Sequence, residues 1–284
     1  MARRKQGQTL TVESTYSEVI DKMRTGVLKD NDMTSSITGD KSFTGTDTFD
    51  EAVHLAVNGW DEGRSELAQS AEFASALVQQ IDQPTWEFAP SGAMPHIPAA
   101  AAGVPDNMMT LYENDTNRKM PIVTMYVDIG ATWNTTTEAM IRRGGAIVAL
   151  VDQIEASGKR VQIVATSATE THGVKFDGVN TSKLIHKITI KEAGEHLDID
   201  RVAFATAHPA MLRRIWFRLV EIHADGIVSG YGNVGKLKAE DIESNAMYVP
   251  PMYGDDGYYS EEEAVETVQG LWREATEGEN FEAA

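Results

Sequence analysis

The chain has 284 residues, enough for one large domain or two small ones, and its apolar content of 42% is ordinary for a protein with a core. It contains no cysteine, which excludes disulfides, thiolate zinc sites and a cysteine nucleophile and favours a reducing compartment. Its longest apolar stretches are far shorter than a membrane span, so we expect a cytosolic protein with no membrane partner.

The charge is not uniform along the chain. Residues 1–116 carry 8 basic against 18 acidic residues, residues 117–238 carry 16 against 12, and residues 239–284 carry 1 against 13. The chain therefore divides into an acidic head, a mildly basic middle and an acidic tail. The net charge of −18, which normally argues against a nucleic-acid partner, hides a middle segment of +4.

The first part of the chain is predicted to be an arm followed by helices. Residues 1–42 are polar and are expected to form a flexible arm with one helical patch, at 16–27. Two helices are predicted next, over 48–58 and over 65–81, where apolar residues recur at helical spacing. Gly59 is a typical helix stop.

The segment 43–116 ends in a stretch without a clear period. Residues 84–105 are rich in Pro, Ala and Gly, which indicates a linker or a long ordered loop. We therefore expect 43–116 to be a helical segment joined by a linker to the part that follows.

Residues 117–238 show alternating strand and helix patterns. β-Branched or apolar runs predict strands, and longer periodic runs with caps predict helices. This alternation predicts a three-layer α/β fold, with a mostly parallel sheet and flanking helices. The expected strands are 120–129, 161–166, 184–190 and 201–206, and the expected helices are 135–153 and 209–222.

Regular structure is expected to fade after Lys238. Residues 239–284 are strongly acidic, and we expect a largely disordered tail with one short helix over 260–272. Such a tail either mimics phosphate and covers a basic groove, or it only keeps the protein soluble.

Asp128 ends the first predicted strand and is the best candidate for a metal ligand. The segment 120–222 resembles the von Willebrand factor A domain in architecture, and that family holds a metal at this place with the pattern Asp-x-Ser-x-Ser. Here Gly130 replaces the first serine, so one oxygen ligand is missing. Thr166, Thr169 and Asp200 are the remaining conceivable ligands. We therefore predict no metal and no other cofactor, and interpret Asp128 as part of a strand-end turn.

No catalytic constellation is recognisable. The seven histidines are scattered, and no nucleophile and base occur at a known spacing. His208, before Pro209, lies at a strand-to-helix turn, where a hydrogen-bonded structural histidine is the simpler interpretation. We therefore predict that the protein is not an enzyme.

Basic residues of the middle segment form two patterned groups. Strand alternation places three lysines on one face of the predicted strand 184–190, and the predicted helix 209–222 carries three arginines beside two aromatic residues. Cations for phosphate and planar groups for bases are what a single-stranded nucleic-acid site requires. The predicted DNA-binding residues are Lys183, Lys187, Lys191, Arg213, Arg214, Arg218, Trp216 and Phe217.

A purely structural interpretation of the same residues stays open. Lysines protect an edge strand from aggregation, and aromatic residues of an amphipathic helix commonly belong to the core. The acidic tail favours the DNA interpretation only if it acts as a phosphate mimic.

Three short motifs carry a further resemblance, namely Phe43-x-Gly45-Thr46 with Phe49-x-x-Ala52, Gly59-Trp60-x-Glu62-Gly63-Arg64, and the α/β segment from Ile122. Over residues 45–240 the chain resembles an orphan family of phage proteins, similar to the single-stranded DNA-binding RNA polymerase cofactors of enquatro-type podoviruses. The resemblance implies single-stranded DNA and a phage RNA polymerase as partners, and the host cytoplasm as location. A homo-oligomer is compatible with it. The alternative is a non-enzymatic, von Willebrand-like interaction or virion assembly protein that does not bind DNA.

Overall fold

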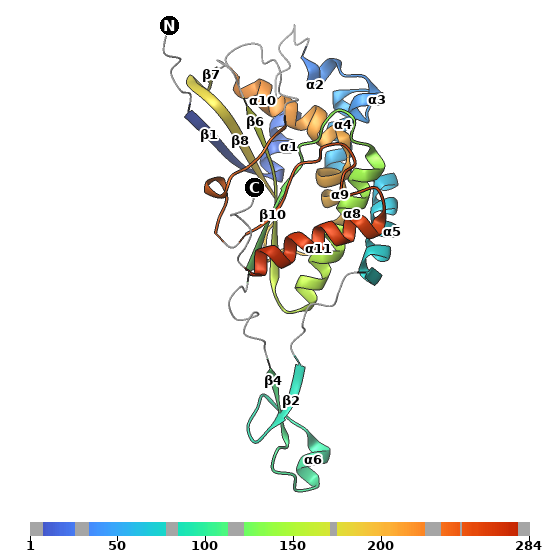
Figure 1. Ribbon diagram of the computed structural model, residues 1–284, viewed down its shortest axis with the longest axis vertical. Coiled ribbons are helices and arrows are strands. Elements are labelled where there is room, and N and C mark those ends of the chain that lie inside the picture. The colour runs from blue at the N-terminus through green and yellow to red at the C-terminus, as the bar shows by residue number, and fades with distance from the viewer. Residues whose placement is uncertain are drawn as a thin grey trace.

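The computed structural model describes residues 8–25, 34–77, 85–112, 122–170, 175–224, 234–244 and 246–277. They form an α/β body and a small antiparallel sheet, residues 85–112, that stands away from the body (Figure 1). No helix in these ranges is long and apolar enough to cross a membrane.

A seven-stranded sheet forms the centre of the body. Its main order is β1 (Gln8–Thr15), β8 (Val179–Lys191), β6 (Arg160–Glu170), β5 (Ile122–Asp128) and β10 (Met247–Val249). The short strands β7 (Lys175–Phe176) and β9 (Val234–Gly235) pair with β8 and β6. β5 is parallel to β6 and β10, β1 is parallel to β8, and β6 and β8 are antiparallel. The predicted α/β class, with a mostly parallel sheet and flanking helices, is thereby confirmed.

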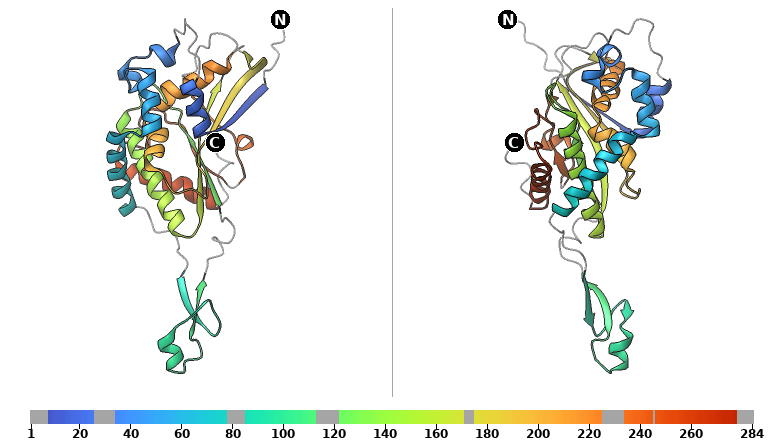
Figure 2. Two further views of the ribbon diagram at one scale, coloured as in Figure 1. Left: turned by 180° about the vertical axis from the view of Figure 1, so that it is seen from behind. Right: turned by 90° about the vertical axis from the view of Figure 1, so that its right-hand side faces the viewer.

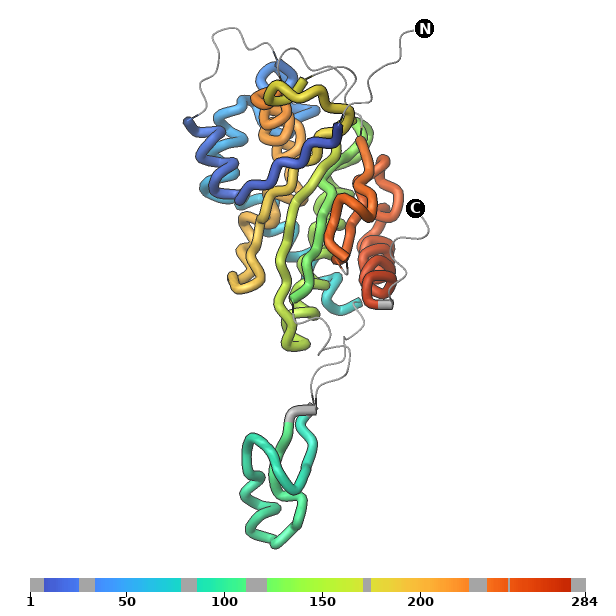
Figure 3. The backbone as a smooth tube through the Cα atoms, turned by 90° about the vertical axis from the view of Figure 1, so that its left-hand side faces the viewer, coloured from blue at the N-terminus to red at the C-terminus, as the bar shows by residue number. Residues whose placement is uncertain are grey.

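Alternation along β5 divides the core between the two faces of the sheet. Met125 and Val127 are buried in the main core on the helical face. Tyr126 points to the other face and joins a smaller apolar cluster there. That second face is covered by residues 234–244 and 246 with the short 3-10 helix η2 (Ala239–Asp241), which Figure 3 shows in front of the strands.

The helices pack mainly on the first face, as the side views show (Figure 2). They are α1 (Tyr16–Thr25), α4 (Phe49–Asn58), α5 (Asp61–Leu77), α8 (Thr137–Ala156), α9 (Ile199–Ala207), α10 (Phe217–His223) and α11 (Glu261–Glu277). The π-helical segment η1 (Met211–Trp216) continues into α10, and the short helices α2 (Ser35–Thr38) and α3 (Lys41–Thr44) contact it.

Helix α8 has 13 of its 20 residues buried, and α5 crosses it closely. A Cβ atom added at Gly145 would lie 2.1 Å from the Ser70 Oγ atom of α5, so glycine is required at this contact. The predicted helix 135–153 corresponds to α8, and Thr136 caps it by accepting a hydrogen bond from the Ala139 N–H at 3.2 Å.

The prediction that residues 1–42 form a flexible arm is corrected by β1 and α1, which belong to the body. β1 pairs with β8 over its whole length, and Val19, Ile20 and Met23 of α1 are buried in the core. The helical patch itself is confirmed by α1. Residues 1–7 and 26–33 lie outside the described residues.

The acidic tail is also corrected, because most of residues 239–284 belongs to the body. β10 extends the sheet beside β5, and α11 packs against α8. Val265, Val268 and Trp272 of α11 are buried, although three glutamates open the helix. Its charge occupies the solvent side, and residues 278–284 lie outside the described part.

The predicted strand over 201–206 is wrong, because these residues form part of helix α9. The Asp198 carboxylate caps this helix by accepting from the Arg201 N–H at 3.1 Å. Residues 202–207 are all buried, so the run lacks the polar face that distinguishes a helix from a strand in sequence.

The predicted linker is a small folded unit, which we call the finger and define as residues 85–112. It contains β2 (Thr85–Ala89), β3 (Met94–Pro95), α6 (Ile97–Ala101) and β4 (Met108–Tyr112), with the strands in the order β2, β4, β3. Both strand pairings are antiparallel. The helix is started by Pro98 in its first turn and by the His96 Nδ1 atom, which accepts from the Ala99 N–H at 3.3 Å.

Candidate functional site

Two of the three predicted DNA-binding lysines lie on the second face of the sheet, where each has a carboxylate partner. The Lys183 Nζ atom lies 2.6 Å from Asp241 Oδ2 of η2. The Lys187 Nζ atom lies 3.5 Å from Glu13 Oε1 of β1 and 5.3 Å from the centre of the Tyr126 ring. Each of these lysine side chains is only 14% exposed. Strand alternation was predicted correctly, but the carboxylates come from distant parts of the chain.

The third lysine, Lys191, is enclosed at the end of β8. Its Nζ atom lies 2.8 Å from Glu155 Oε1 and donates to the Val161 carbonyl at 2.8 Å. Only 2% of this side chain is exposed. Lys191 therefore holds the end of α8 against the sheet.

The predicted arginines fasten the segment 34–47 to the body. Arg213 donates to the carbonyl oxygens of Phe43, at 2.7 Å, and Thr132, at 3.2 Å. Arg218 forms an ion pair with Glu221 at 3.5 Å, and both side chains are buried. Glu221 in turn accepts a hydrogen bond from the Ser36 N–H at 3.2 Å.

Arg214 is the centre of this arrangement. Its side chain is fully buried and its guanidinium group donates to five oxygen atoms of the segment 34–47 at 2.8–3.1 Å. The acceptors are the carbonyl oxygens of Ser36, Ile37, Gly39 and Thr46 and the hydroxyl of Thr46. All five N–H groups of the guanidinium group therefore bond to carbonyl or hydroxyl oxygens of the protein, and none is left to donate to a phosphate.

The aromatic residues predicted to stack on bases are core residues. Trp216 is 1% exposed and meets His186 edge to face, and Phe217 is also buried. Six of the eight predicted residues are thus buried and Lys183 and Lys187 are only 14% exposed, so DNA contact through these residues stays a prediction that their burial does not favour. The segment 34–47 covers η1 and α10, so the two arginines of η1 bond to that segment and the aromatic rings pack in the core.

The strand-end carboxylate Asp128 is also enclosed. Its Oδ1 atom accepts from the Gly130 N–H at 2.9 Å, and its Oδ2 atom accepts from the Tyr248 hydroxyl at 3.1 Å. Burial raises the pKa of the Asp128 carboxyl to about 7, against the opposing effects of these hydrogen bonds and of the Arg143 charge. Asp128 is therefore an internal hydrogen-bonding group at the end of β5.

Of the other conceivable metal ligands, Thr166 is the register partner of Asp128 on β6, whereas Asp200 lies on a different element. Thr166 donates its hydroxyl to the His186 carbonyl at 2.9 Å, and Asp200 lies on α9, 3.3 Å from Arg64 Nη1. In the part of the chain that the structure describes, no group of three His, Asp or Glu residues could hold a metal ion. The strand-end turn remains the interpretation of Asp128.

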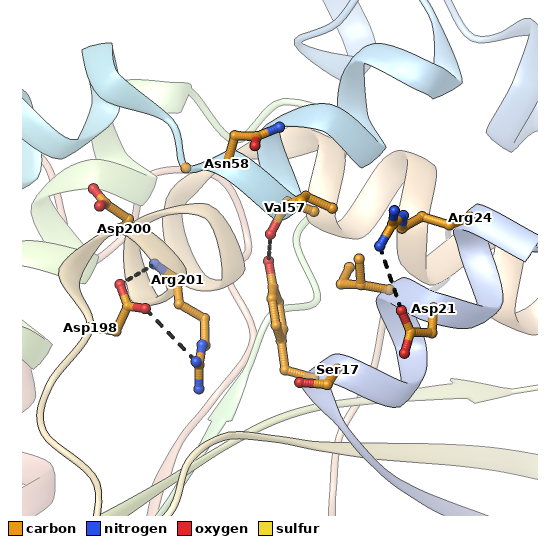
Figure 4. A pocket seen from close by; sticks show the side chains of 12 residues that line it. Ser17, Asp21, Arg24, Val57, Asn58, Asp198, Asp200 and Arg201 are labelled. Atoms are coloured by element: carbon orange, nitrogen blue, oxygen red, sulfur yellow. Dashed lines mark hydrogen bonds and ion pairs between the residues drawn. The ribbon is translucent and has the colours of Figure 1, made fainter.

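A cavity of about 310 Å³ lies between α1, the end of α4 and the start of α9 (Figure 4). Four of its five charged side chains pair with one another. Asp198 lies 3.8 Å from Arg201, and Asp21 lies 3.8 Å from Arg24. The fifth, Asp200, lies 3.3 Å from Arg64, which is outside the lining, so each charged group of the cavity already has a partner of opposite charge.

The finger presents apolar side chains to solvent. Trp86 and Phe88 are 49% and 57% exposed, and Met94 and Ile97 are 48% and 73% exposed. Residues 86–110 include no buried residue. An exposed, contiguous apolar group of this kind is typical of an interaction site.

The sequence contained a signal for this surface. Trp86 and Phe88 alternate with Glu87 between two prolines, Pro84 and Pro90, which is a short strand pattern. Because residues 84–105 are rich in Pro, Ala and Gly, they were predicted to be a linker or a long ordered loop instead.

Comparisons with known proteins identify a family without assigning an activity. The family described as "Domain of unknown function (DUF7192)" matches residues 9–273. No curated protein and no solved structure matches the chain.

Proposed function

The chain belongs to the DUF7192 family, whose description states no activity, and we propose from its geometry that it is a non-enzymatic interaction protein. The finger is the part that binds a partner protein. The observation that carries this proposal is the finger's exposed apolar surface without a core beneath it. A unit of this size buries too little surface to be stable alone, so a partner that covers it also stabilises it.

The chemistry of the finger favours a protein partner over nucleic acid. It carries Glu87 and Asp106 and no lysine or arginine, so nothing on it neutralises phosphate. Single-stranded DNA binding and a polymerase partner stay predictions from the resemblance. The enclosed positions of Arg214 and Lys191 do not support them.

Photo-crosslinking in cells that make the protein tests the proposal. A photoreactive phenylalanine analogue replaces Phe88 of the finger or, as a matched control, Phe73 of α5, which is 45% exposed on the body. We expect position 88 to yield a discrete protein adduct that Trp86→Ser suppresses, and position 73 to yield little. Absence of a protein adduct at position 88, or the same adducts at both positions, would contradict the proposal.

A further inference from the structure

The register of the finger strands defines one apolar face. Trp86 and Phe88 are two residues apart on β2 and therefore point to the same side. Phe88 is paired with Met109 of β4, and Met109 with Met94 of β3, so these three side chains form one row across the sheet. We call Trp86, Phe88, Met94 and Met109 the apolar face.

The charged residue of β2 lies on the opposite side. Glu87 is paired with Thr110, and both point away from the apolar face. The finger carries only two of the 43 acidic residues of the chain and none of its 25 basic residues. The apolar face is thus close to uncharged on a chain with a net charge of −18.

An uncharged face selects its partner by shape and apolar area. A basic partner would be attracted more strongly to the acidic body than to the finger. A second copy of the same face meets no like charge, and Figures 1 and 2 show the finger projecting away from the body. Two copies can therefore join at their fingers while their acidic bodies stay apart, and salt screens the remaining repulsion.

The available area suits a reversible dimer. Ile97 of α6 adds to this face, because the ring of the preceding residue, His96, meets the Phe88 ring edge to face. The half-exposed aromatic side chains, with Met94 and Ile97, offer roughly 400 Å² per finger if a covered aromatic side chain buries about 200 Å². Two fingers would then bury about 800 Å², below the roughly 1,200–2,000 Å² of specific, stable interfaces and within the range of weak, transient ones. An association in the micromolar range is the expected result.

Resting on the proposed function, we infer that the finger's partner is the finger of a second copy of this chain. The two apolar faces pack against each other around a twofold axis, so each residue of the face contacts the same surface on its partner. Trp86 and Phe88 are the anchors of this interface.

Sedimentation velocity of the full chain over a concentration series tests this inference. We expect a monomer–dimer equilibrium that persists or strengthens at high salt, because no charge pairing holds it. Trp86→Ser with Phe88→Ser should raise the dimer Kd at least tenfold, whereas Trp133→Ser, at an 83% exposed position of the body, should leave it unchanged. A chain that is monomeric at every concentration, or a dimer insensitive to the finger variants, overturns the inference.

Cysteine crosslinking separates loss of contact from loss of finger structure. Because the chain has no cysteine, Phe88→Cys and Glu87→Cys each introduce a single thiol on opposite faces of β2. Oxidation should link two copies through position 88 far more readily than through position 87. Equal linkage at the two positions overturns face-to-face packing.

The two proposals fail differently. A monomeric purified chain whose position 88 crosslinks to another protein in cells overturns the second copy and leaves the proposed function standing. A chain without any adduct at position 88 removes both.

Discussion

Arg214 places a permanent positive charge inside the protein, with backbone and hydroxyl oxygens as its described acceptors. Replacing it by methionine leaves the carbonyls of the segment 34–47 unpaired in a dry environment. We predict that Arg214→Met lowers the free energy of unfolding by about 3 kcal/mol or more. Urea titration measures this loss.

The matched control for Arg214 is Arg64, whose ion pair with Asp200 is 57% exposed on the arginine side. Arg64→Met should cost less than about 1 kcal/mol, because exposed ion pairs contribute little. Similar losses for the two variants would show that Arg214 does not organise the segment 34–47.

Asp128 makes stability depend on pH in a defined direction. Burial raises the pKa of its folded-state carboxyl from 3.8 to about 7, so the folded protein holds a proton that the unfolded chain releases. This contribution to stability is complete below pH 3.8 and is lost as the pH rises through 7. At about 1.4 kcal/mol per pKa unit, the loss is on the order of 4 kcal/mol.

Asp128→Asn removes this dependence and keeps an acceptor for the Gly130 N–H. We predict that the variant is about 3 kcal/mol more stable than the parent at pH 8 and about equal to it at pH 5. Urea titrations at both pH values test this. Equal stability of the two proteins at pH 8 would mean that the Asp128 carboxylate is not destabilised by burial.

His186 acts in the opposite sense. Burial lowers the pKa of its imidazole to about 3, with smaller contributions from His223 and Lys22, so the folded protein keeps it neutral. Its contribution is present above pH 6.5 and is lost as the pH falls towards 3. Between about pH 3.8 and 6.5 the contributions of His186 and Asp128 therefore oppose each other, and comparing Asp128→Asn with the parent at the same pH isolates the contribution of Asp128.

The sequence predicted which lysines share a face of the sheet, but not which carboxylates pair with them. Strand alternation placed Lys183 and Lys187 on one face correctly. It could not reveal Asp241 and Glu13, because these partners are 58 and 174 positions away in sequence. Charge patterns predict which side chains share a face, but the partner that neutralises them is a property of the tertiary fold.

At the scale of elements, β10 and α11 link the acidic C-terminal part to the core. They and the segment between them bury apolar side chains against α8 and β5, among them Met247, Val249, Val265, Val268 and Trp272. At about 1.5–3 kcal/mol for each fully buried side chain, their removal costs on the order of 10 kcal/mol. This approaches or exceeds the whole stability of an ordinary domain.

We therefore predict that a chain ending at Lys238 does not fold, whereas a chain ending at Glu277 keeps the thermal midpoint of the full protein. Circular dichroism and thermal unfolding measure both. A folded chain ending at Lys238 would mean that β10 and α11 are dispensable for the core.

The elements predicted correctly are those whose signals are local. α8 has a capping threonine and a helix stop, and β5 and β6 have apolar runs of strand length. α9 was mistaken for a strand because Val202, Phe204 and their neighbours are buried all round. β1 was mistaken for a flexible arm because its polar side chains remain exposed at an edge of the sheet.

At the scale of the whole molecule, the α/β class followed from the order of strands and helices. The division of the chain into domains could not be predicted from its charge segments, because the boundaries between these segments are not the boundaries between structural units. The acidic ends supply β1 and β10, the two edges of the main strand order, and the basic middle supplies the strands between them. Charge composition reflects which side chains are exposed to solvent, whereas the order of strands in a sheet depends on backbone pairing between distant parts of the chain.

The two ends of the finger lie next to each other. Its first and last residues, Thr85 and Tyr112, are paired with each other on adjacent strands. For the body, the 28 residues of the finger, inserted between α5 and β5, thus act as a short loop whose two ends are already held together, so their length adds little entropic cost. A different hairpin with the same closure could be grafted at this point without disturbing the body, so the surface that we propose as the binding site can be exchanged independently of the core.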